Sequence, residues 1–89
     1  MAVDLLVFSA EWCSPCKMAE RAGVYDAVRE AGFPVTKIDV DKQRAIADQY
    51  GIRAMPTYII RVDNVPYGRI VGAKDAATLI GELRLAEEH

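Results

Sequence analysis

Cysteine and histidine are scarce in this chain. Among its 89 residues there are two cysteines, Cys13 and Cys16, and one histidine, His89. A zinc site needs about four ligands, so metal binding would require ligands from a second molecule. A structural disulfide is also disfavoured, because a bridge that spans only two residues constrains little of the unfolded chain. Catalysis by the cysteine pair is the interpretation that these absences favour.

Long apolar runs and an excess of charge of one sign are lacking as well. No run approaches the ~18 residues that a membrane span needs. Residues 3–10 are apolar, but Asp4 interrupts them and no basic stretch precedes them, so they predict a strand rather than an export signal. The net charge of −2 gives no basis for binding nucleic acid or an anionic membrane. We therefore expect a cytoplasmic protein without nucleic-acid or membrane partners.

The composition is that of an ordinary compact protein. Hydrophobic residues make up 52% of the chain and charged residues 27%, which argues against disorder. A chain of this length can bury one core, and repeats and linkers are absent, so residues 1–89 are expected to form a single domain.

The two cysteines lie in the segment 12–18, WCSPCKM, between an apolar strand-like run and a helix-like pattern. A helix N-terminus carries partial positive charge and unpaired N–H groups, which stabilise a thiolate and so provide a nucleophile at neutral pH. The second cysteine, one turn on, can reach the first sulfur and release whatever the first has bound. Pro15 suits the first helical turn, where its missing N–H has no consequence.

The hydrophobic pattern predicts elements in the order β-α-β-α-β-β-α. Strands are expected at 5–8, 35–40, 58–62 and 67–71, and helices at 15–31, at 41–50 and after Asp75. A bend in the first helix is expected at Gly23, and Asp41 and Asp75 are the predicted N-caps of the other two helices. The strand 5–8 should be central, covered on both faces. The fold class is thus α/β, a four-stranded mixed sheet with helices on both faces.

Four segments, taken together, resemble the thioredoxin family. Residues 10–18 (AEWCSPCKM) match its active-site segment, with Ser14 in place of the usual glycine. Residues 40–41 (VD), 50–57 (YGIRAMPT) and 71–73 (VGA) are similar to its other landmarks, in the correct order. The resemblance covers roughly 3–83 and has no counterpart of the family's first strand and helix. It implies a thioredoxin-like fold of glutaredoxin size, in which strand 35–40 lies at a sheet edge guarded by polar residues.

The resemblance also implies roles for individual residues. Cys13 would attack a substrate disulfide and Cys16 would resolve the mixed disulfide. Pro56 would follow a cis peptide bond, although only about 5–6% of X–Pro bonds are cis in general. Met55 would offer backbone groups to the substrate, and Gly72 would leave a flat apolar patch. The residues expected to bind substrate are Trp12, Ser14, Pro15, Met55, Pro56 and Gly72.

Three positions depart from the family's pattern. Val7 stands where the family keeps a buried aspartate, Ser9 where it often has a second tryptophan, and Arg21 where a proline usually kinks the helix. Val7 would leave Cys16 without an adjacent carboxylate base. Lys37 would lack its acidic partner, and would reach solvent or add positive potential near the sulfurs.

We interpret the chain as a protein disulfide reductase that cycles between a Cys13/Cys16 dithiol and disulfide. The expected partners are disulfide-containing proteins and a thioredoxin reductase-like electron donor; no cofactor or metal is expected, and the protein should be a monomer. The alternative is a redox-gated binding module that uses the same apolar face. A thiol oxidase would use the same chemistry in reverse, but the lack of an export signal disfavours it.

Overall fold

The apolar strand β1 (Val3–Ser9) forms the centre of the sheet in the computed structural model, which describes residues 2–88. The strand order is β2-β1-β3-β4. β1 runs parallel to β2 (Val35–Asp39) and antiparallel to β3 (Thr57–Val62), and β4 (Val65–Val71) returns antiparallel to β3. The predicted mixed sheet and the central place of its first strand are confirmed.

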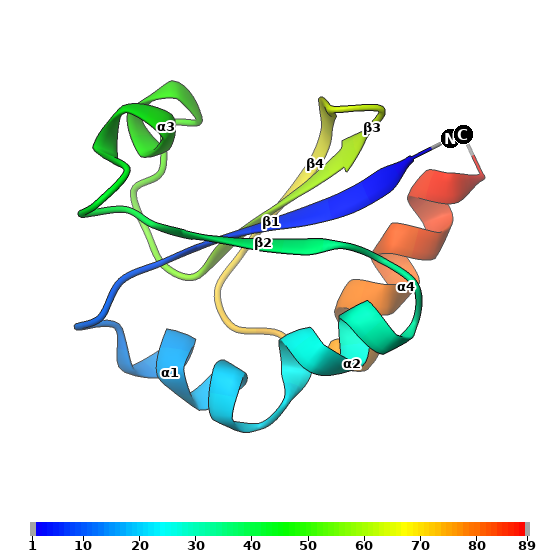
Figure 1. Cartoon of the computed structure of the whole chain (residues 1–89), viewed down its shortest axis with the longest axis horizontal. Coiled ribbons are helices and arrows are strands. Elements are labelled where there is room, and N and C mark those ends of the chain that lie inside the picture. Colours follow the sequence, from blue (N-terminus) through cyan, green and yellow to red (C-terminus); the bar gives the residue numbers. More distant parts are fainter. Residues whose placement is uncertain (1, 89) are drawn as a thin grey trace.

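Helices cover both faces of this sheet. Figure 1 shows α1 (Ser14–Arg21), α2 (Val24–Glu30) and α4 (Ala76–Glu87) on one side and α3 (Arg44–Gln49) on the other. The side chains of β1 alternate between these two layers, as the period of a strand requires. Leu5 and Val7 belong to the core under α1, α2 and α4, whereas Leu6 and Phe8 belong to the core under α3.

The helix expected over 15–31 is two helices in the structure. α1 ends at Arg21 and α2 begins at Val24, with Gly23 between them at a φ of 76°. That left-handed conformation is readily accessible to glycine but strained for most residues. The bend predicted at Gly23 is therefore confirmed as a complete break, which turns α2 to pack against α4.

The N-cap predicted at Asp41 is wrong. α3 begins only at Arg44, after Gln43, and has no side-chain cap. The turn before it is closed by Asp39 instead, whose Oδ1 accepts the N–H groups of Asp41 and Lys42 at 2.9 and 3.3 Å. Short-range turns of this kind are a common use of aspartate, and here they leave the Asp41 carboxylate free for another contact.

Two other predictions for single elements are confirmed. Asp75 caps α4, its Oδ1 accepting the N–H of Thr78 at 2.8 Å. β2 is an edge strand within the described residues, and its Thr36 and Lys37 are exposed. The hairpin is tighter than predicted, because Asp63 and Asn64 alone form the turn, with φ of 51° and 68°, and Pro66 lies inside the edge strand β4.

Candidate active site

Cys13 and Cys16 lie at the start of α1 and are joined by a disulfide, with their Cα atoms 5.3 Å apart. Cys13 is the N-cap residue of the helix, and its Sγ accepts the backbone N–H of Cys16 at 3.3 Å. Once the bridge is reduced, this N–H and the positive end of the helix both favour a thiolate on Cys13. The local geometry is thus that of a nucleophile with a second sulfur within bonding distance.

Both cysteines are shielded from water. They are only 5% and 4% exposed, and they form a small apolar cluster with Ala10, against which Val40 and Met55 pack. Met55 comes from the segment before β3, so the structure brings this predicted site residue directly to the cysteines.

The Met55–Pro56 peptide bond is cis, as the resemblance implied. Pro56 is fully buried, and its carbonyl oxygen accepts the N–H of Gly72 at 2.9 Å. This bond links the segment before β3 to the loop after β4. Gly72 has a φ of 92°, which favours glycine at this position. Met55, Pro56 and Gly72 are therefore linked through the backbone, and Met55 is the one that packs against the cysteine cluster.

The remaining predicted residues are on the outer surface of the site. The Trp12 side chain is 65% exposed, and its Nε1 donates to Oδ2 of Asp41 at 2.8 Å. Ser14 and Pro15 are exposed and line an open apolar hollow of about 440 Å³ together with Met18 and Ala73. Sequence reasoning missed Met18 as a residue of this surface. The sequence signal for it was its spacing, because Met18 lies one helical turn beyond Pro15.

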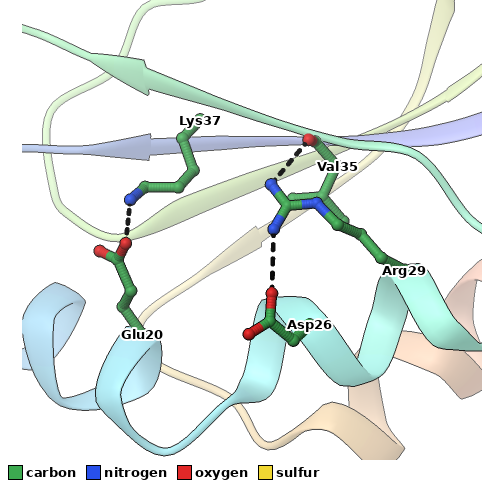
Figure 2. A network of polar contacts seen from close by, with 5 residues as sticks. All are labelled: Glu20, Asp26, Arg29, Val35 and Lys37. Carbon is green, nitrogen blue, oxygen red and sulfur yellow. Dashed lines mark hydrogen bonds and ion pairs between the residues drawn. The ribbon is translucent and has the colours of Figure 1, made fainter.

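Lys37 has an acidic partner, contrary to expectation. Its Nζ makes an ion pair with Glu20 of α1, shown in Figure 2. Val7, the neighbour of Lys37 in the register of β1 and β2, is completely buried. The acidic partner of Lys37 thus comes from α1 and not from position 7 of β1.

A pair of buried hydroxyls lies deeper in the same layer. Tyr25 of α2 and Tyr58 of β3 are within hydrogen-bond distance, at 3.2 Å between their oxygens. Burial raises the pKa of Tyr25 well above its ordinary value, and the hydrogen bond with Tyr58 and the charge of Glu20 add to the rise. Tyr25 is thus neutral at physiological pH and serves the packing of α2.

Within residues 2–88, the acidic, histidine and cysteine side chains form no group of three or more suited to a metal ion. None of the helices in the same range is long and apolar enough to cross a membrane.

Comparison with known proteins gives a consistent result. The family model described as Thioredoxin matches residues 2–84. The chain belongs to the thioredoxin family. It is 36% identical to a thioredoxin of Chlamydia caviae over 96% of this chain and 80% of that protein. It is 40% identical to a thioredoxin of Mycobacterium bovis over 89% of this chain and 69% of the other.

Similarity to solved structures agrees with this assignment. A mutant thioredoxin from Halobacterium salinarum superposes with a TM-score of 0.86 at 36% identity, covering 93% of this chain and 73% of that one. Family membership and the bonded Cys13–Cys16 pair make this thioredoxin-family protein a thiol-disulfide oxidoreductase that reduces protein disulfides.

Proposed function

We propose that Cys13 is the attacking thiolate and Cys16 the resolving thiol. The observation that carries this assignment is the position of Cys13 at the N-cap of α1, where its Sγ accepts the N–H of Cys16. The Cys13 thiolate attacks one sulfur of a substrate disulfide and releases the other as a thiolate. Cys16 then attacks Cys13, forming the intramolecular disulfide and releasing the second substrate sulfur. Two electrons pass from the protein to the substrate.

We propose that the substrate lies across the surface formed by Trp12, Ser14, Pro15, Met55, Pro56 and Gly72. Support comes from three observations: the indole beside Cys13 is exposed, Met55 packs against the two shielded cysteines, and Pro56 is bonded to Gly72 through the backbone. An extended substrate strand could pair with the backbone of Met55 while Trp12 and Pro15 contact its side chains. Such a surface suits many sequences, since main-chain contacts do not distinguish side chains.

The proposed electron donor is a thioredoxin reductase, and the proposed compartment is the cytoplasm, where dithiols are kept reduced. We propose that the protein acts as a monomer. One coupled assay tests the direction and the donor together: NADPH consumption during insulin reduction, with thioredoxin reductase or with glutathione and its reductase. Turnover with thioredoxin reductase is expected, and activity with glutathione alone would contradict the choice of donor.

The exposed apolar hollow beside Pro15 favours a second candidate, a binding module gated by redox state. Replacing both cysteines by serine separates the two functions. A binding module keeps its partner and its biological activity in that variant, whereas a reductase loses activity completely.

A further inference from the structure

An open pocket of about 250 Å³ lies beside the resolving cysteine. Cys16 lines it although the residue is almost completely buried, so the pocket is the approach from solvent to this side chain. Glu20 and Lys37 line the same pocket. Cys16 and Glu20 are four positions apart on α1, which places them on one face of the helix.

Lys37 fixes where the Glu20 carboxylate lies. The lysine reaches from the edge strand β2 toward α1, and its Nζ pairs with Oε1 of Glu20, as Figure 2 shows. The Glu20 side chain is 54% exposed and that of Lys37 is 36% exposed. The carboxylate is therefore held at the pocket and can still exchange protons with water.

Two other carboxylates line this pocket, and both have other contacts. Asp39 accepts two backbone N–H groups in the turn after β2. Glu11 makes an ion pair with Lys42, with 3.5 Å between Oε1 and Nζ. Neither is on α1. Glu20 is thus the pocket carboxylate that shares a helix face with Cys16.

The other titratable groups around the pocket do not replace it. Lys17 follows Cys16 on α1, and its ammonium group offers hydrogen-bond donors but no acceptor. Tyr25 faces Glu20 from α2, and its raised pKa keeps it protonated. Lys37 is the cation from β2, and Val7 contributes no charge from β1.

We propose that Glu20, positioned by Lys37, accepts the proton of the Cys16 thiol during resolution. The role rests on the proposed function, in which Cys16 attacks the mixed disulfide at Cys13. The Cys16 proton passes through pocket water to the Glu20 carboxylate, and the Cys16 sulfur forms a bond to Cys13 as the Cys13–substrate bond breaks. The released substrate thiolate takes a proton from solvent, and Glu20 returns its proton to solvent.

A base matters here because an ordinary thiol is only a few per cent thiolate near pH 7. A base can therefore raise the rate of resolution by at most about 30-fold at that pH. This advantage disappears as the pH passes the ordinary thiol pKa of about 8.5, because the thiol then ionises without help. Glu20 would supply this base from α1, since Val7 in β1 carries no charge.

The test is a stopped-flow reaction of the reduced protein with 5,5′-dithiobis(2-nitrobenzoate). The first thionitrobenzoate is released by Cys13 attack at a rate proportional to reagent, and the second by Cys16 resolution at a rate independent of reagent. In Glu20→Gln we expect an unchanged first phase and a second phase about three- to tenfold slower near pH 7. The second-phase rates of wild type and Glu20→Gln should become equal above about pH 9. Imidazole buffer, an external base, should raise the second-phase rate of the variant toward that of wild type.

Glu11→Gln is the matched control, because it removes an equal charge from the same pocket but not from α1. It should leave both phases unchanged, and circular dichroism should show both variants folded. An unchanged second phase in Glu20→Gln would overturn the role. So would a faster one, since an unpaired Lys37 would then be promoting the Cys16 thiolate. Equal slowing by Glu11→Gln would also contradict it. A wild-type protein without the first phase would instead overturn the proposed function itself.

Discussion

The indole of Trp12 is held by Asp41, 29 positions away in the sequence, through a 2.8 Å hydrogen bond from Nε1 to Oδ2. This contact joins the loop before α1 to the turn after β2. Because Trp12 is otherwise exposed, the bond sets the direction in which the indole faces a partner. Asp41 is therefore a positioning residue for the proposed substrate surface.

Asp41→Ala should weaken reduction of a protein disulfide about three- to tenfold, mainly through a higher KM, because the loss of one charge-assisted hydrogen bond leaves Trp12 mobile. Attack on a small disulfide reagent should change little. Insulin reduction and reagent kinetics measure the two effects. Asp48→Ala is the control, since Asp48 lines the same hollow as Trp12 while the indole N–H is bonded to Asp41. Equal loss in both variants would indicate a general charge effect.

Asp4 and Arg61 form a two-point ion pair between β1 and β3. Arg61 Nε donates to Oδ1 at 3.0 Å, and Nη2 donates to Oδ2, with both side chains less than a quarter exposed. The hydrogen bond to Asp4 is the main reason why the pKa of Arg61 is raised. Asp4→Asn should lower the free energy of unfolding by about 1–3 kcal/mol, because the guanidinium remains largely buried without its counter-ion.

Urea denaturation measures this loss. The double variant Asp4→Val with Arg61→Val should be more stable than the sum of the two single changes predicts, because no charge is then left unpaired. If the changes in the free energy of unfolding of the two single variants simply add up to that of the double variant, the interaction between Asp4 and Arg61 contributes nothing to stability.

Asp75 makes stability depend on pH through the cap of α4. Its hydrogen bonds with Thr78 lower its pKa from the ordinary value. A carboxyl with a lowered folded pKa stabilises the protein fully above its unfolded pKa, about 3.9, and less as the pH falls through the folded value. Asp75→Ala should therefore lower the melting temperature by a few degrees near pH 7, and the gap to wild type should narrow below about pH 4.

Thermal melts across this range check the pH effect. Asp75→Asn keeps a capping oxygen that does not titrate. The difference in melting temperature between Asp75→Asn and Asp75→Ala should therefore not narrow in acid. If wild type melts above Asp75→Ala by the same margin near pH 7 and below about pH 4, the charge of Asp75 contributes nothing to stability.

Much of the fold could be predicted because its signals are local. The apolar run of β1, the glycine at position 23 and the cap at Asp75 each act within a few residues. The choice between Asp39 and Asp41 as the polar group of the turn could not be predicted, since one ends the strand, the other follows it, and an aspartate at either place can close a turn. Tertiary contact decided it, because Asp41 binds Trp12.

The candidate site was predicted to a similar extent. The cysteines were found from their spacing and the segment 55–56 from the resemblance to the thioredoxin family, and the structure packs Met55 against the cysteines. The pairing of Glu20 with Lys37 was not predicted, although the charge missing at Val7 was noticed. The pair depends on how α1 crosses β2, and a contact between residues 17 positions apart on different elements has no periodic signal.

The most direct test of the central claim is mixed-disulfide trapping with single serine variants. Cys16→Ser keeps the nucleophile at the start of α1 and removes the thiol that resolves the intermediate, so it should accumulate a covalent complex with a disulfide substrate on a non-reducing gel. Cys13→Ser keeps only the buried second thiol and should trap nothing. Trapping by Cys13→Ser alone, or equal trapping by both variants, would contradict the assignment of the two cysteines.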